Sequence, residues 1–299
     1  MATVTATRRA KPKQQPMPWH VVEKSRNVHE FRTSLAAGRE AWLLWMSDEH
    51  WDHPKCRLDI LKRHHEEALE RGALIVKVGD TFCAMQGKGD PRGDKGSVRP
   101  EHQKGNYLDA LVETATNWYT PYAGNIGVIG LGNHETSIWK HHETCLIDRL
   151  CSRLQDRGGI ARKGGYGGWI RCMFKSNGTR HQSFRTFYNH GWGGGGPVTK
   201  GVIDFNRMHE HGVADAYVSG HVHYKNVIPN ERAVLNESSV VEVRKYYDVR
   251  CGTYKDEWED GYAGFHVEKG RGPRPLGGWW QRFYTQGDKV KCEWTEAAA

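Results

Sequence analysis

The chain has 299 residues and a formal net charge of +8, and 37% of its residues are hydrophobic, which suits one large α/β domain. No apolar run approaches the ~20 residues that a membrane-spanning helix needs, so a helical membrane protein is excluded. The seven cysteines are scattered and form no Cys-x-x-Cys pair, which excludes a disulfide framework and a cysteine–zinc module. With no signal-peptide pattern at the N-terminus, we expect a cytoplasmic protein.

The first 18 residues are basic and contain no acidic residue. Arg8, Arg9, Lys11 and Lys13 supply four of the eight net positive charges. We expect residues 1–18 to form a disordered basic tail. The tail either only solubilises the chain or acts as an arm that follows the phosphates of a nucleic acid.

Five apolar or β-prone runs each end in polar residues that can bind metal ions. The runs are residues 41–47, 73–78, 126–131, 183–188 and 214–218, followed by Asp48-Glu49-His50, Gly79-Asp80, Gly132-Asn133-His134-Glu135, Asn189-His190-Gly191 and Gly220-His221-Val222-His223. In open α/β sheets, binding sites form outside the carboxyl ends of the strands. We therefore expect these five groups to converge at one site.

The side chains of these segments suit a pair of divalent ions. Among their side chains are two Asp, two Asn and five His. A single His at a strand end is more often an ordinary polar residue, but five such segments in one order favour a metal site. Two ions roughly 3.5–4 Å apart suit phosphoryl transfer because they hold both the attacking and the leaving oxygen. Nitrogen and oxygen ligands without cysteine favour Mn, Fe, Zn or Ni over Ca.

The series DEH, GD, GNHE, NHG and GHVH resembles the calcineurin-like metallophosphoesterase family, in particular its small bacterial or bacteriophage members. The resemblance covers about residues 41–225, and GNHE and GHVH are its specific motifs. It implies an α/β fold, a four-layer α/β/β/α sandwich with a two-metal site at the strand ends. We expect residues 19–295 to form this catalytic domain.

The resemblance also implies a role for each motif residue. The first metal would be held by Asp48, His50 and His223, the second by Asn133, His190 and His221, with Asp80 as the bridge. His134 would lie just outside the metals, where it stabilises the transition state or protonates the leaving oxygen. Manganese is the first expectation for both ions, with Fe, Zn or Ni as alternatives.

One position departs from the family pattern. The family usually continues GD to a further Asp, which in many members orients the catalytic His, whereas this chain has Cys83 there. The metal ligands are not affected, but His134 then needs another orienting group, and Glu135, Asp90 and Asp94 are candidates. The Arg residues that protein phosphatases of the family place near GD and GNHE are also absent. This absence argues against a phosphoprotein phosphatase.

The segments between the motifs predict further helices and a second sheet. Helices are expected over residues 57–71, 105–118, 136–156 and 200–212, and β-branched runs within 232–266 suit a second sheet. The pairs His64-His65 and His141-His142 are expected on solvated helix faces and not as ligands. Residues 295–299 are expected to be unstructured.

Two glycine-rich stretches are candidates for contact with a substrate. Residues 86–104 carry five basic and three acidic residues, and form either a mobile basic lid over the metals or a solvated loop. Trp192, beside a run of glycines, either stacks on a base or packs within a turn. Trp279-Trp280 is expected to pack in the core or on a sheet.

The sequence therefore predicts a two-metal-dependent phosphoesterase that hydrolyses phosphodiester bonds by metal-activated hydroxide. Basic charge and aromatic residues favour a nucleic acid or a nucleotide as the substrate, and hence a nuclease or phosphodiesterase. Two alternatives stay open. One is a phosphomonoesterase acting on a small phosphorylated metabolite or nucleotide. The other is a non-catalytic, metal-stabilised module that binds nucleic acid.

Overall fold

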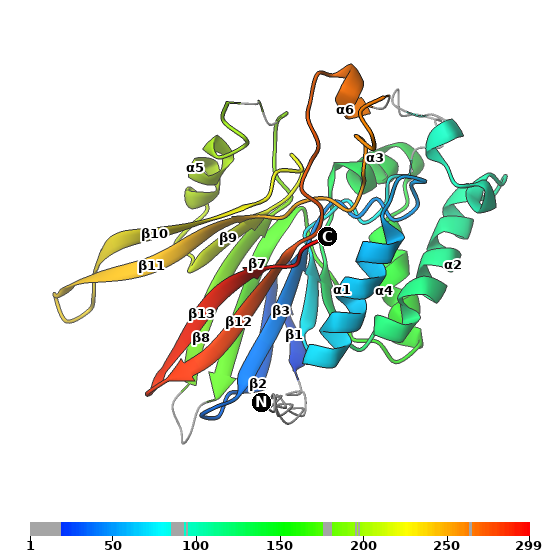
Figure 1. Cartoon of the computed structure of the whole chain (residues 1–299). Helices are drawn as coiled ribbons and strands as arrows, with labels where there is room; N and C mark the ends of the chain where they lie inside the picture. The colour runs from blue at the N-terminus through cyan, green and yellow to red at the C-terminus, as the bar shows by residue number, and fades with distance from the viewer. Residues whose placement is uncertain are drawn as a thin grey trace, which may run out of the picture.

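The computed structural model describes residues 19–84, 93, 95–175, 181–194, 196, 198–262 and 265–299. Two β-sheets pack face to face, with four helices outside one sheet and one short helix outside the other (Figure 1). The α/β/β/α sandwich expected from the sequence is confirmed. The basic tail, residues 1–18, lies outside the described residues.

The six-stranded sheet carries the first three motif strands. Its order is β13-β12-β3-β4-β5-β6, and its strands are β3 (Glu40–Met46), β4 (Leu74–Lys77), β5 (Ile126–Ile129), β6 (Arg162–Lys163), β12 (Trp279–Gln286) and β13 (Lys289–Glu296). β3 to β6 are parallel, whereas β12 runs antiparallel to both β3 and β13. The apolar runs that precede the motifs are buried because this sheet is covered on both faces.

The seven-stranded sheet carries the last two motif strands. Its order is β1-β2-β7-β8-β9-β11-β10, and its strands are β1 (His20–Ser25), β2 (Val28–Ser34), β7 (Gly167–Lys175), β8 (His181–Asn189), β9 (Ala216–Ser219), β10 (Asn226–Leu235) and β11 (Val241–Arg250). The second sheet predicted within 232–266 is thus much larger than expected. The part of this prediction that covers residues 251–262 is wrong, because these residues form no strand.

The helices agree with the sequence except at one break. They are α1 (Leu58–Arg71), α2 (Tyr107–Tyr119), α3 (Asn133–His142), α4 (Leu146–Asp156), α5 (Ile203–His209) and α6 (Phe265–Glu268), with 3₁₀ turns η1 (Lys95–Ser97), η2 (Pro100–His102) and η3 (Thr120–Tyr122). The single helix predicted over 136–156 is wrong. Glu143 adopts a left-handed conformation, with φ of 53°, and ends α3 before α4 begins.

Three apolar clusters hold the layers together. The first lies between the six-stranded sheet and α1 to α4, the second lies between the two sheets, and the third lies under α5. Trp280 belongs to the first cluster and is 2% exposed, as expected for a packing residue. Among the described residues, no helix is long and apolar enough to cross a membrane. All seven cysteines lie in the described part of the chain, and all are free thiols.

Two expectations about α1 and the C-terminus are wrong. His64 and His65 are buried, and neither lies on a solvated face. His64 bonds to the hydroxyl of Tyr254 at 2.8 Å and to the carbonyl of Ala298 at 2.9 Å. Residues 295–299 are ordered by the same contacts: the first two belong to β13, and the backbone N–H of Ala297 donates to Gly278. His141 and His142, in contrast, are exposed as predicted.

Much of the predicted lid, residues 86–92 and 94, lies outside the described residues. The described part of this stretch includes η1 and η2. Val98 and His102 are buried there, and the ring of His102 lies 5.7 Å from that of Trp51. The C-terminal half of the stretch therefore packs on the helical side of the core.

Candidate metal centre

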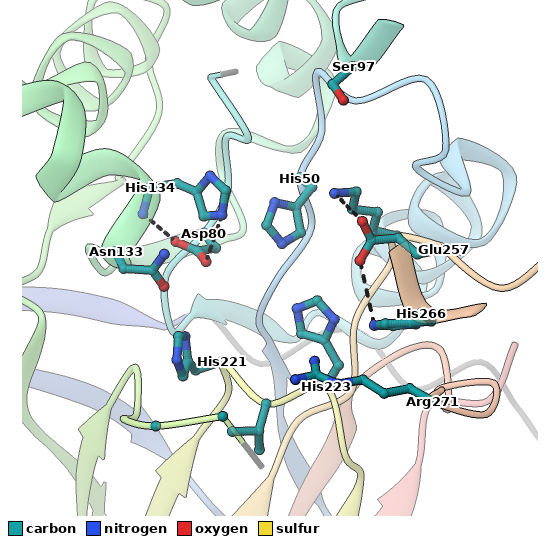
Figure 2. A pocket seen from close by; sticks show the side chains of 14 residues that line it. His50, Asp80, Ser97, Asn133, His134, His221, His223, Glu257, His266 and Arg271 are labelled. Atoms are coloured by element: carbon teal, nitrogen blue, oxygen red, sulfur yellow. Dashed lines mark hydrogen bonds and ion pairs between the residues drawn. The ribbon is translucent and has the colours of Figure 1, made fainter. Parts of the chain in front are cut away.

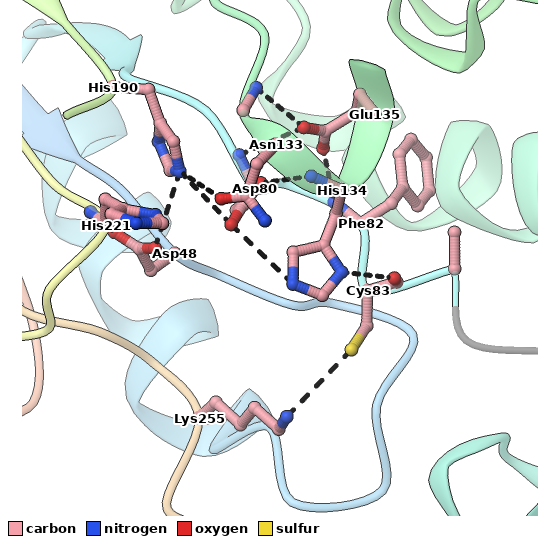
Figure 3. Close-up of polar contacts among 12 residues, drawn as sticks. Asp48, Asp80, Phe82, Cys83, Asn133, His134, Glu135, His190, His221 and Lys255 are labelled. Carbon is pink, nitrogen blue, oxygen red and sulfur yellow. Dashed lines mark hydrogen bonds and ion pairs between the residues drawn. The ribbon is translucent and has the colours of Figure 1, made fainter. Parts of the chain in front are cut away.

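The five motifs meet at one edge of the sandwich, where β3, β4, β5, β8 and β9 end (Figures 2 and 3). Asp48 follows β3, Asp80 follows β4 and Asn133 begins α3 just after β5. His190 follows β8, and His221 follows β9 with His223 two residues on. The structure therefore brings together all seven predicted ligands and His134.

Six of the candidate ligands form two groups that overlap with the two predicted sets. In one group the ligand atoms of Asp48, His50 and His223 lie within 4.8 Å of one another, and Asp48 Oδ1 is 3.3 Å from His223 Nε2. In the other group, the ligand atoms of Asp80, His190 and His221 also lie within 4.8 Å of one another.

Asp80 and His190 connect the two groups. Nε2 of His190 is 3.2 Å from Asp80 Oδ2 and 3.2 Å from Asn133 Oδ1. The same nitrogen is 4.0 Å from Asp48 Oδ1 in the first group. His190 Nε2 thus lies within 4.0 Å of carboxylate oxygens of both Asp80 and Asp48, so the two groups adjoin.

The backbone at these ligands is strained. Asp48, His50, Asp80, His221 and His223 all have left-handed backbone conformations, with φ between 46° and 69°. Asp and His tolerate this region better than most residues, but it still costs of order 1–3 kcal/mol at each position. Such strain clusters at functional sites. Here it turns the chain sharply enough to aim alternate side chains at one point.

The motif glycines are required for space. A Cβ at Gly132 would collide with Oδ1 of Asp80, and a Cβ at Gly220 would collide with Oγ of Ser47 and lie 2.5 Å from Oδ2 of Asp48. The second contact matters because the backbone N–H of His221 donates to Asp48 Oδ2 at 2.8 Å. The glycines of GNHE and GHVH therefore let the strand ends approach closely.

The residues present fit divalent ions. His50 is 2% exposed, and among the described groups neither of its ring nitrogens has a hydrogen-bond partner. Burial, followed by the positive charges of His134 and Lys255, lowers the pKa of His50 well below its usual value. A buried neutral imidazole with a free lone pair is costly unless it is ligated. A metal ion would satisfy it.

A backbone carbonyl on the side away from the candidate ligands orients the ring of His190. Its Nδ1 lies 3.1 Å from the carbonyl of Val78 and donates to it, which leaves Nε2 for the site. Burial lowers the pKa of His190, but the carboxylates of Asp80 and Asp48 outweigh burial and raise it to about 9. In the metal-free protein, His190 is thus protonated and supplies the positive charge that these carboxylates attract.

Glu135 has a different role from the one considered in the sequence. Its buried carboxylate accepts the backbone N–H groups of Asp80, Phe82 and Gly132 at 3.1, 2.8 and 2.8 Å (Figure 3). Burial and the charge of Asp80 raise the pKa of Glu135 to about 8. Glu135 therefore holds the GD and GNHE turns together. The suggestion that Glu135 orients the His134 ring is wrong.

The His134 ring is oriented by the backbone of Cys83, the residue that stands where the family usually has an aspartate. Nδ1 of His134 lies 2.7 Å from the carbonyl oxygen of Cys83 and donates to it, while Nε2 faces Asp80 Oδ2 at 3.9 Å. Asp52 fixes this turn by accepting the N–H groups of Cys83 and Ala84 at 2.6 and 2.9 Å. Asp90 and Asp94 lie outside the described residues.

A pocket of about 410 Å³ opens over the candidate ligands. Its far wall is formed by Lys255, Glu257, His266 and Arg271, opposite Asp80 and His134 (Figure 2). Sequence analysis missed this wall, because it follows the last motif and has no periodic pattern; the charged run from Lys255 to Glu257 is its one visible signal. Trp192 is half-buried and stacks on His211 at 6.3 Å, so it packs within the protein.

Comparison with known proteins finds similarity only at the level of solved structures. No family model and no curated protein matches the sequence. Vacuolar protein sorting 29 from Cryptosporidium parvum is 12% identical with a TM-score of 0.33, covering 87% of this chain and 99% of its own. A metallophosphoesterase from Sphaerobacter thermophilus is 16% identical with a TM-score of 0.33, covering 85% and 88%. Plasmodium GAP50 is 10% identical with a TM-score of 0.40, covering 86% and 85%.

At these identities and TM-scores the comparison adds little to the motifs and the geometry of the site. The two-sheet architecture agrees with the metallophosphoesterase-like fold that the motifs predicted, and His/Asp groups that could hold metal ions lie at the strand ends.

Proposed function

We propose that this protein is a two-metal-dependent phosphoesterase that hydrolyses phosphodiester bonds in a nucleic acid or a nucleotide. The observation that carries this proposal is the pair of adjoining His/Asp groups, with the His134 ring beside Asp80. When bound, two divalent ions, manganese being our first expectation, would supply Lewis acidity toward the phosphate and activate a water molecule. Asp48, His50 and His223 would hold one ion, Asn133, His190 and His221 would hold the other, and Asp80 would bridge them.

The protein's own groups account for proton delivery and positioning. Cys83 fixes the proton of His134 on Nδ1, so Nε2 faces the pocket. In its doubly protonated form, His134 can donate a proton from Nε2 to the leaving oxygen. His50 offers a neutral imidazole nitrogen as it stands, and His190 offers one once an ion displaces its proton.

The choice of a nucleic acid or nucleotide rests on charge. The chain carries eight net positive charges, and Lys255 and Arg271 line the pocket itself. Phosphodiesters are anionic along their length, so a basic protein attracts them beyond the site of cleavage. The free thiols support our further proposal that the protein works in the reducing cytoplasm.

The test compares bis-p-nitrophenyl phosphate with p-nitrophenyl phosphate, with manganese added, for the wild type and Asp80→Asn. Faster hydrolysis of the diester, lost in the variant, is the expected result. Hydrolysis of the monoester alone would favour the phosphomonoesterase alternative. No hydrolysis of either, together with salt-dependent binding of DNA, would favour the binding module.

A further inference from the structure

A buried lysine stands on the far wall of the pocket. Lys255 is 9% exposed, and its ammonium lies 2.6 Å from Glu257 Oε1 and 4.0 Å from Cys83 Sγ (Figure 3). Neither it nor Glu257 belongs to any motif of the family. A buried charge is costly unless it is paired or used, so this position requires an explanation.

The lysine is fixed relative to the candidate metal ligands. Its backbone N–H donates to the Thr253 hydroxyl at 3.0 Å, and that hydroxyl donates to the carbonyl of Asp48 at 2.9 Å. The backbone N–H of Tyr254, the residue before Lys255, also donates to the carbonyl of Asp48, at 3.0 Å. The backbone of Lys255 is therefore anchored to the loop that carries Asp48 and His50, and Glu257 holds its ammonium.

The ammonium and the His134 ring both contact Cys83. Cys83 connects the two groups, because its carbonyl accepts from His134 while its thiol faces Lys255 (Figure 3). A thiol brings no formal charge, whereas the aspartate that the family usually has there would place a second carboxylate beside the ammonium. The cysteine thus leaves Lys255 with one carboxylate in contact and with access to the pocket.

We propose that Lys255 is a catalytic residue that binds an anionic oxygen of the substrate, either a phosphoryl oxygen or the leaving oxygen beside His134. This proposal rests on the phosphoesterase function. A fixed ammonium in a site of low dielectric stabilises charge that develops in the transition state without reorganising at that moment. Glu257 holds the ammonium in place.

The first test measures anion binding and needs no turnover. Inorganic phosphate is titrated by calorimetry into the manganese-loaded full chain. We expect Lys255→Met to weaken phosphate binding roughly 10- to 100-fold, as for loss of a charged hydrogen bond, and Lys255→Arg to restore most of it. Lys225→Met is the matched control, because Lys225 is also buried and pairs with Glu296 at 2.8 Å but lies outside the pocket lining.

The second test changes the neighbour and leaves the lysine in place. Cys83→Asp adds the carboxylate that the family usually has, and Cys83→Ser adds none. If Lys255 binds the substrate, Cys83→Asp weakens phosphate binding by about 10-fold, and Cys83→Ser leaves it near the wild-type value. If Lys255 has no such role, Cys83→Asp binds phosphate as tightly as the wild type or more tightly.

The outcomes separate this proposal from the proposed function. Phosphate affinity that stays within twofold in Lys255→Met at equal metal content overturns the role of Lys255. If that variant loses metal, the comparison of Cys83→Asp with Cys83→Ser decides. Phosphate binding that depends on Lys255 in a chain without phosphoesterase activity would overturn the function and keep the anion site. A rate loss larger for a dinucleotide than for a nitrophenyl ester assigns the contact to the leaving oxygen, and equal losses assign it to a phosphoryl oxygen.

Discussion

The Asp80 carboxylate is the group that we expect to bridge the two metal ions. It lies 3.2 Å from His190 Nε2, and its Oδ1 accepts the backbone N–H of His134 at 3.0 Å. Asp80→Asn keeps the shape but removes the negative charge that would bridge two dications. We expect most of the metal and most of the activity to be lost, as measured by elemental analysis and diester hydrolysis. A variant with full metal content and full rate would show that Asp80 is not the bridge.

His134 should affect chemistry and not metal content. Its ring is held by the Cys83 carbonyl, its Nε2 faces Asp80 Oδ2 at 3.9 Å, and its centroid lies 4.9 Å from that of the His50 ring. His134→Ala is expected to keep both ions and to slow turnover by roughly 10²–10⁴, as for loss of a general acid. His141→Ala, an exposed histidine on the same helix, is the control. Turnover at the wild-type rate in His134→Ala would remove this histidine from the mechanism.

The motifs predicted which side chains meet at the strand ends, because each motif depends on a local pattern: a buried strand followed by a turn of Asp, Asn, His and Gly. The partner of the His134 ring could not be predicted in this way. That partner is a backbone carbonyl, and every residue has one, so Cys83 gave no sign of it. The wall residue Lys255 was missed for a related reason, since its position depends on tertiary hydrogen bonds to Asp48.

At the scale of elements, α1 makes stability depend on pH. Burial lowers the pKa of His64 to about 4, and the Ala298 carbonyl only partly opposes this effect. Above about pH 6.5 the imidazole is neutral in both states. Between about pH 6.5 and 4 the unfolded chain binds a proton that the folded chain does not, so stability falls as pH falls.

We expect this histidine to cost about 2 kcal/mol of unfolding free energy at pH 5 relative to pH 7. Urea unfolding at both values, with chelator present so that metal loss does not contribute, measures the difference. His64→Gln should reduce the pH dependence by about that amount, because glutamine does not titrate. His141→Gln, on an exposed face, should not change it. An unchanged pH dependence in His64→Gln would contradict the burial effect.

The elements themselves were predictable to different degrees. β3, β4 and β5 are apolar runs because both faces of their sheet are covered, and such runs are visible in any sequence. β1 and β2 were not predicted: β1 lies at the edge of its sheet, and both strands mix polar and apolar residues without a clear period. The break between α3 and α4 occurs at Glu143, an ordinary helix former, so propensity gave no warning of it.

At the scale of the whole molecule, the candidate metal site joins the two sheets. Asp48, Asp80 and Asn133 follow strands of the six-stranded sheet, whereas His190, His221 and His223 follow strands of the seven-stranded sheet. Bound ions would therefore link the two halves of the sandwich. Ligands that bind only the folded state raise its stability. We expect manganese to raise the melting temperature by several degrees, and a chelator to reverse the change.

The Asp80→Asn variant is the control for that effect, and its melting temperature should respond little to manganese. Calorimetry or circular dichroism at matched protein concentration measures both. A melting temperature that is the same with and without manganese in the wild type would contradict a link between the sheets.

The basic tail gives a prediction that concerns the whole chain. Deletion of residues 1–18 removes four positive charges. We expect weaker binding of DNA or RNA, with a shallower salt dependence, and little change in hydrolysis of a small chromogenic ester. Fluorescence anisotropy with a labelled oligonucleotide at two salt concentrations measures the first effect. Equal losses in binding and in ester hydrolysis would contradict a nucleic-acid arm.

The dispersal of the ligands along the chain has a consequence for biosynthesis. Asp48 and His223 belong to one ligand group but are separated by more than half of the sequence, and β12, which pairs with β3, is later still. At 5–20 residues per second, on the order of 10–30 s pass between the emergence of these two ligands from the ribosome. The nascent chain therefore cannot acquire a complete ion site early. Metal loading is expected to follow translation, when the cellular pool of free ions decides which metal is inserted.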